Sequence, residues 1–326
     1  MDNCGDATTY CCAECGEEGG VSLKACKSCM LVKYCNADCQ RNHWSTHKKQ
    51  CRIRAAELRD EVLFKDPPPK EDCPICFLPM PVTILSCIPL PPATITSVPI
   101  YDFAVANAGL AVQRTEEFYS CCGKSICKGC IYSFCKSGNA RKCPFCNSDR
   151  VIKTDEKEVE EIMKRVGAND PGAICELAND YNSGNIGLQQ DDEKARELLR
   201  RAAELGSSHA HFCLGIEYYE GGDLKKAFFH YETAAIAGHE LARSFLGTMY
   251  DRSGNIEQAV KHWMIAASAG SYFAMHSLQK LSEKGIVSRE SIDSALTAFN
   301  DSCAEMRSEA RSMYIAFMTA IKNNAK

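Results

Sequence analysis

The chain has 326 residues, 25% of them charged, and a formal net charge of −4. This length allows two or three domains, and the negative charge disfavours general nucleic-acid binding, which depends on cations that neutralise phosphates. The sequence contains no run of about 18 apolar residues and no apolar leader after a basic start, so we expect an intracellular protein without a membrane span.

Cysteines distinguish the two halves of the chain. There are 22, and 19 of them lie between Cys4 and Cys146. Such a density indicates either disulfides or bound metal. Disulfides would need an oxidising compartment, whereas cysteine pairs with two-residue gaps are typical of zinc knuckles. We therefore expect zinc, whose thiolate ligands would make the protein still more acidic.

Residues 12–51 contain eight candidate ligands in four pairs. Two pairs have two-residue gaps, which suit a turn that aims both sulfurs at one ion. The other two have three-residue gaps, which place both side chains on one helix face. The pairs are Cys12 and Cys15, Cys26 and Cys29, Cys35 and Cys39, and His47 and Cys51. Eight such ligands make two closed tetrahedral sites, which are structural rather than catalytic. His43 is left over, and we expect it on a solvated helix face.

The string YCNADCQRNHWSTHKKQC, from Tyr34 to Cys51, closely resembles the MYND zinc-finger family. The resemblance implies two interleaved zinc sites, one of Cys12, Cys15, Cys35 and Cys39 and one of Cys26, Cys29, His47 and Cys51. It also implies a groove for short proline-containing peptides, with an extended edge at residues 22–24 and with Gln40 and Trp44. A tryptophan face suits proline, and a glutamine amide can bond a peptide backbone. Alternatively, Trp44 is the core of a small domain.

A second cysteine-rich module follows a stiff, proline-containing connector at residues 65–70. Its pairs with two-residue gaps are Cys73 and Cys76, Cys127 and Cys130, and Cys143 and Cys146. Together with the string SCCGKSICKGC, they resemble a RING-type finger. The resemblance implies one site of Cys73, Cys76, Cys127 and Cys130, and a second that joins Cys121 and Cys122 to Cys143 and Cys146. Lys124 stands where that family has a histidine, and Cys87 competes for a place in the second site.

RING-type fingers recruit a ubiquitin-conjugating enzyme, and the resemblance assigns the contacts to Ile75 and Pro144. The family often has a basic residue just after the last cysteine, where this chain has Asn147. The long segment 88–117 between the ligands is rich in proline and then apolar, and we expect it to be a loop.

The second half of the chain repeats itself. Three leucines are each followed four residues later by a tyrosine, and an alanine pair and a glycine then close each unit. These residues are Leu177, Leu214 and Leu246; Tyr181, Tyr218 and Tyr250; pairs starting at Ala202, Ala234 and Ala266; and Gly206, Gly238 and Gly270. Gly206, Gly238 and Gly270 are spaced 32 residues apart. A period of 32 residues with two helical stretches predicts a helix-hairpin solenoid, and the pattern weakens after Gly270 as in a capping unit.

The repeat pattern resembles SEL-one-like repeats, whose arrays commonly serve as adaptors in protein complexes. The six histidines of the array are expected to be surface or packing residues rather than ligands. We also expect a charged helix at residues 155–166, between the second finger and the array, and one more helix at residues 302–322 that packs on the array end.

The sequence therefore predicts a multidomain chain with two small cross-braced zinc fingers, at residues 12–51 and 73–150, and an all-α solenoid at residues 170–322. Four zinc ions are expected, two in each finger. The predicted function is a protein-binding adaptor, and the alternative is a ubiquitin ligase that uses the second finger. A lysine methyltransferase is rejected, because the Asn-His-Ser-Cys type of signature that such enzymes carry is absent.

Overall fold

The computed structural model describes residues 12–16, 22–81, 115–149 and 154–324. The chain divides into two compact units, Met1–Lys65 and Asp66–Lys326. Within the described ranges, no helix is both long enough and apolar enough to cross a membrane. Most of the segment predicted as a loop, and Cys87 just before it, lie outside the described residues.

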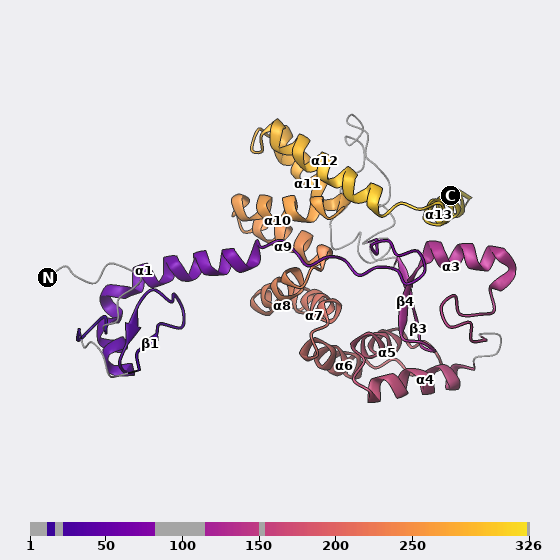
Figure 1. Cartoon of the computed structure of the whole chain (residues 1–326), viewed down its shortest axis with the longest axis horizontal. Coiled ribbons are helices and arrows are strands. Elements are labelled where there is room, and N and C mark those ends of the chain that lie inside the picture. Colours follow the sequence, from indigo (N-terminus) through magenta and orange to yellow (C-terminus); the bar gives the residue numbers. More distant parts are fainter. Residues whose placement is uncertain (1–11, 17–21, 82–114, 150–153, 325–326) are drawn as a thin grey trace. The chain divides into compact units, whose positions relative to one another are not determined.

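In the first unit, two short antiparallel strands precede one long helix (Figure 1). These elements are β1 (Lys24–Ala25), β2 (Lys33–Tyr34) and α1 (Ala37–Leu63). Helix α1 begins after Asn36, whose side-chain oxygen accepts a hydrogen bond from the N–H of Cys39 over 2.9 Å. The helix continues past Cys51, where the predicted finger ends, to Leu63.

The second unit contains the second cysteine-rich module, which is built on a β-hairpin and a short helix. Its elements are β3 (Glu116–Tyr119), β4 (Lys124–Cys127), α3 (Lys128–Phe134) and the π-helical turn η3 (Cys135–Asn139). Strands β3 and β4 pair antiparallel, with Glu116 opposite Cys127 and Tyr119 opposite Lys124. The hairpin therefore ends at a ligand cysteine, which the next helix follows directly.

Helix α4 leads into four helical hairpins, which follow one another from α5 to α12 (Figure 1). The bounds are α4 (Asp155–Gly167), α5 (Pro171–Ser183), α6 (Asp192–Glu204), α7 (Ser208–Glu220), α8 (Leu224–Ile236), α9 (Glu240–Arg252), α10 (Ile256–Ser268), α11 (Tyr272–Glu283) and α12 (Arg289–Glu305). Helix α4 occupies the place of the expected charged helix and packs on α5. The structure therefore has the predicted helical-repeat solenoid.

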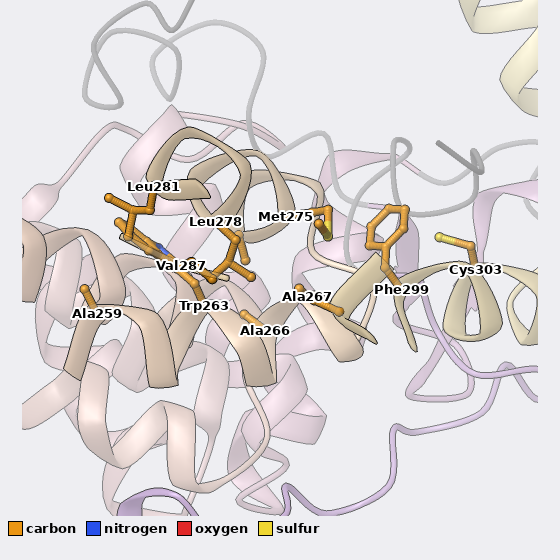
Figure 2. Packing of buried hydrophobic residues seen from close by; sticks show 12 residues of the cluster. Ala259, Trp263, Ala266, Ala267, Met275, Leu278, Leu281, Val287, Phe299 and Cys303 are labelled. Carbon is orange, nitrogen blue, oxygen red and sulfur yellow. The ribbon is translucent and has the colours of Figure 1, made fainter. Parts of the chain in front are cut away.

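The residues that define the repeat form its core and its turns. The leucine of each repeat and all three alanine pairs are buried, so adjacent helices approach closely. Gly206, Gly238 and Gly270 end the second helix of each repeat with φ angles of 88°, 89° and 90°, a conformation that glycine adopts at little cost. In the last hairpins, Leu278, Leu281 and Val287 pack with Trp263 (Figure 2).

The end of the chain differs from the prediction of one helix at residues 302–322 that packs on the array end. Helix α12 ends at Glu305, and a separate helix, α13 (Glu309–Asn324), packs on α3 of the second cysteine-rich module. The physical reason lies in its side chains. Tyr314 and Phe317 contact Tyr132 of α3, with ring centroids 6.0 and 5.0 Å apart, and Arg311 is buried beside the finger.

Candidate metal centres

Four of the cysteine pairs adopt the same type of backbone turn. In each pair the carbonyl of the first cysteine accepts a hydrogen bond, 2.8–3.0 Å long, from the backbone N–H of the residue that follows the second cysteine. That residue has a positive φ angle in every case. The four residues are Gly16, Met30, Phe77 and Asn147. Such a turn directs both sulfurs of a pair to one side, which is the geometry that the two-residue gap predicts.

The first module brings its eight candidate ligands together as two groups, and within each group the ligand atoms lie within 4.8 Å of one another. The groups are Cys12, Cys15, Cys35 and Cys39, and Cys26, Cys29, His47 and Cys51. The first pair along the chain joins the third, and the second joins the fourth. The sites are therefore interleaved, and α1 contributes ligands to both of them.

His47 is buried and aims Nε2 at the sulfur of Cys29, 3.2 Å away. Burial, with a smaller contribution from His43, lowers the pKa of His47 and so favours the neutral imidazole, the form that binds metal. His43, which is expected on a solvated helix face, is half-buried on α1 and belongs to no ligand group. Its ring stacks on His47 with centroids 5.6 Å apart, and its Nδ1 lies 2.9 Å from the Tyr34 hydroxyl.

The second module also brings together two groups of four within 4.8 Å, again with interleaved pairs. One group is Cys73, Cys76, Cys127 and Cys130, and the other is Cys121, Cys122, Cys143 and Cys146. Adjacent cysteines can share a site because the chain turns tightly there. The N–H of Gly123 donates to the Tyr119 carbonyl over 2.7 Å, and Gly123 has a φ angle of 67°. Cys135 is exposed and belongs to neither group.

These donor sets fit zinc. Each group offers four cysteine or histidine atoms at mutual distances that suit a tetrahedral ion, and no cysteine of the described part forms a disulfide. Burial raises the pKa of Cys12, but hydrogen bonds from the backbone of Cys15, Cys35 and Glu14 lower it to about 6 overall. These hydrogen bonds favour the thiolate of Cys12, whereas the pKa values of Cys35 and Cys39 in the same group are raised. With four protein ligands each, such sites are structural.

The other predicted contact residues lie at the surface to different degrees. Gln40 and Trp44 are exposed on α1, and Trp44 keeps 43% of its surface accessible, so it is not the core of the module. Residues 22–24 lead into β1, and Ser22 and Lys24 are exposed. In the second module Ile75 is exposed and Pro144 is half-buried.

Sequence reasoning missed two side-chain contacts of the second cysteine-rich module and its connector. Arg311 donates to Cys76 and Cys127, and Lys70, the last residue of the connector, forms an ion pair with Glu240 at 2.6 Å. In both cases the partners lie far apart in the sequence. No spacing pattern could have identified them.

Comparison with known proteins places two kinds of module on this chain. Residues 11–51 match the MYND finger, and residues 171–207, 208–239 and 240–271 match the Sel1 repeat. For the second cysteine-rich module, a RING-like finger is suggested by the two groups of cysteines and not by a family match. A MYND finger implies zinc, and the four groups of ligands are compatible with it.

The curated relatives share short segments. A SET and MYND domain-containing protein of Dictyostelium discoideum is 50% identical over 36 residues, which are 11% of this chain and 7% of the relative. Tudor domain-containing protein 1 of Oryzias latipes is 33% identical over 60 residues, 18% of this chain and 5% of the relative. The chain thus covers less than a tenth of the length of either relative.

Two solved structures are similar to part of this chain. A Sel1 repeat protein from Oxalobacter formigenes is 30% identical, with a TM-score of 0.35 over 38% of this chain and 98% of the other. A protective antigen of uropathogenic Escherichia coli strains with an SLR fold is 23% identical, with a TM-score of 0.39 over 57% of this chain and 40% of the other. From the matched segments, this chain carries a MYND finger followed by three Sel1 repeats.

Proposed function

We propose that this chain is an intracellular adaptor whose MYND finger binds short proline-containing peptides and whose Sel1 array binds other proteins. MYND and Sel1 modules generally mediate contacts between proteins, and the free cysteines of the described part suit a reducing compartment. Zinc serves the fold of the fingers and takes no part in chemistry, since each candidate site among the described residues has four protein ligands.

The observation that carries the proposal is the position of Trp44 and Gln40 on α1. They stand one helical turn apart and are both exposed, while Cys39 and His47 on the same stretch of helix belong to two different ligand groups. Two metal sites would therefore hold this stretch of helix rigid. An exposed tryptophan held in this way presents a flat apolar surface at a low entropic cost, and glutamine beside it supplies a donor and an acceptor.

Peptide binding is tested with the full chain, zinc-loaded, against a panel of short proline-containing peptides. Trp44→Ala should weaken binding by tenfold or more, a change of about 1.4 kcal/mol. Ile53→Ala is the matched control, because Ile53 is an apolar residue of α1 that is 46% exposed. Equal affinity of both variants and the wild type would contradict the proposed groove, provided that zinc content is unchanged.

We also propose four zinc ions per chain, one for each group of four ligands. Native mass spectrometry of the purified protein should give this stoichiometry directly. Cys29→Ser should lower it within the first module and leave the ions of the second module in place. A stoichiometry of two would leave two of the four groups without zinc.

A second candidate function, ubiquitin ligase, is favoured by the exposed apolar residues of two knuckles in the second module. Ile75 and Phe77 on one knuckle and Phe145 on the other are exposed, which is unusual for side chains of this size in a small module. These knuckles supply ligands to the two different groups. The interleaved arrangement is the one that the RING resemblance implies, and such a surface suits a conjugating enzyme.

Ligase activity is tested by discharge of ubiquitin from a panel of charged conjugating enzymes. Ile75→Ala should abolish acceleration, and Leu224→Ala, which removes an exposed apolar residue of α8 in the same unit, should not. No acceleration by the zinc-loaded wild type across the panel would remove this candidate and leave the adaptor in place.

A further inference from the structure

Arg311 is a buried cation that lies against a candidate metal site. It belongs to the first turn of α13, and only 3% of its surface is accessible. Its guanidinium donates to the carbonyls of Leu78, Pro79 and Met306 over 3.2, 2.8 and 2.7 Å. It also donates to two cysteine sulfurs. Nε lies 3.5 Å from the sulfur of Cys127, and Nη2 lies 3.5 Å from that of Cys76.

The charges explain why a guanidinium is suited to this position. Four thiolates around one Zn²⁺ carry a net charge of −2, and charge buried in a protein interior needs compensation. Arg311 places a positive charge next to two of the four sulfurs in the group of Cys73, Cys76, Cys127 and Cys130. The carbonyls of Leu78 and Pro79 fix its position, since they belong to the turn that follows Cys76.

The backbone of α13 lies equally close to the finger. A Cβ atom at Gly129 would lie 2.7 Å from Cα of Arg311, so only glycine permits this approach. Gly129 stands between the ligands Cys127 and Cys130, at the start of α3. Further along the two helices, Tyr132 contacts Tyr314 and Phe317. The whole first half of α13 is therefore docked on the helix that carries Cys130.

We propose that α13 is a zinc-dependent latch, in which the zinc–thiolate group of Cys73, Cys76, Cys127 and Cys130 holds Arg311 and with it the C-terminal helix. Arg311 in turn strengthens zinc binding at this site, because coupling between two binding free energies is reciprocal. Loss of this one ion would release α13 from α3 and expose Tyr132. The inference rests on the proposed zinc occupancy of this group, and the test reports that occupancy separately.

The test compares zinc-loaded full-length variants in the presence of excess chelator. Zinc release is followed with time, alkylation of Cys73 and Cys76 identifies the site that opens, and hydrogen exchange reports the docking of α13. Arg311→Gln should lower the affinity for one ion by about tenfold or more, the usual effect of removing an outer partner of a metal ligand, and so speed its release to the chelator. Arg311→Lys should give an intermediate rate, since lysine keeps the charge but lacks the planar fork of donors.

Two further variants separate the latch from general stability. Gly129→Ala should speed both zinc release and exchange in α13, since it displaces the helix without removing a charge or a ligand. Arg243→Gln is the matched control, because Arg243 is a buried arginine of the array that donates to the Ala235 carbonyl over 2.8 Å, and it should leave zinc release unchanged.

The outcomes are distinct. Release at the wild-type rate in Arg311→Gln, with α13 nonetheless undocked, would mean that Arg311 is a packing residue only and would overturn the latch. Full alkylation of Cys73 and Cys76 in the untreated wild type would show that this site holds no zinc. That result would overturn both the latch and the proposed stoichiometry of four ions. Peptide binding by the MYND finger is independent of both results.

Discussion

The indole nitrogen of Trp263 donates a hydrogen bond to the backbone carbonyl of Ser244 over 3.2 Å, and this brings the ring against the backbone of α9. Gly247 makes the approach possible, since a Cβ atom there would lie 2.4 Å from that nitrogen. The preceding repeat has the same arrangement, since a Cβ atom at Gly215 of α7 would lie 2.6 Å from the Tyr231 ring. In both repeats a glycine on the first helix receives an aromatic ring from the second.

This packing predicts that Gly247→Ala destabilises the array. The added methyl group would force the Trp263 ring away from Ser244, and overpacking of this kind costs about 1–3 kcal/mol. Chemical denaturation followed by fluorescence measures the change. Gly167→Ala is the matched control, because Gly167 ends α4 and a Cβ atom there meets nothing within 4 Å. Similar effects at both positions would argue against the steric explanation.

Zinc removal should unfold the MYND finger and leave the array folded. The buried core of the finger consists of Cys12, Cys26, Cys29, Cys51 and Tyr34, so it is made almost entirely of candidate ligands. The energy for folding then comes from the metal, about 10–16 kcal/mol per structural zinc in finger peptides. Amide NMR signals of the first unit should collapse on chelation while most helical circular dichroism persists. A finger that keeps its dispersed signals after complete chelation would refute this account.

The parts that sequence could predict are those that depend on local spacing. A two-residue gap between cysteines determines the knuckle turn, and the repeat of leucine, alanine and glycine determines the hairpins, whatever lies elsewhere in the chain. The sequence left Cys121 and Cys122 in competition with Cys87, since no spacing rule favours adjacent ligands. The tight turn at Gly123 brings both into one group, and the part of the chain that the structure describes does not include Cys87.

The parts that could not be predicted are long-range contacts of single side chains. One helix at residues 302–322 was expected to pack on the array end. The docking of α13 on α3 depends on a glycine at position 129 and on the buried Arg311, far apart in the chain. The partial burial of His43 was missed for a similar reason, since its contact with Tyr34 forms only when β2 lies against α1.

The array should become less stable in acid because of His239. This residue caps α9 through Nδ1, which accepts from the N–H of Ala242 over 3.3 Å, and its ring stacks on Phe212. Burial lowers the pKa of His239 to about 3, while in the unfolded chain it is about 6.5. The folded-state pKa is depressed, so protonation favours unfolding as the pH falls below 6.5. The loss should reach about 1 kcal/mol at pH 5.5.

The neighbouring repeats supply the control for this effect. Ser207 and Ser271 cap the corresponding helices, so His239→Ser keeps a cap and removes the titrating group. Urea denaturation of both proteins at pH 7.5 and 5.5 gives the difference, in which acid effects on the zinc sites cancel to first order. A variant that loses as much stability as the wild type would show that His239 does not titrate in this range.

The connector should be held to the array by a largely buried ion pair. Lys70 Nζ lies 2.6 Å from the carboxylate of Glu240, and it also donates to the Ala269 carbonyl over 2.6 Å. Burial raises the pKa of Glu240 to about 7, although Lys70 opposes the rise. Lys70→Met would leave the carboxylate buried without this cation, which typically costs about 3–5 kcal/mol. Double substitution with Glu240→Gln should recover much of that loss.

The pH dependence of this cost identifies its origin. A carboxyl whose folded-state pKa lies above the unfolded value of about 4.3 contributes stability at low pH, which is lost as the pH rises to the folded-state pKa. In the wild type this loss ends near pH 7, whereas without Lys70 the folded-state pKa is higher and the loss continues above it. The cost of Lys70→Met, from urea denaturation, should therefore be larger at pH 8 than at pH 6. An equal cost at both values would mean that Lys70 acts through packing of its alkyl chain rather than through its charge.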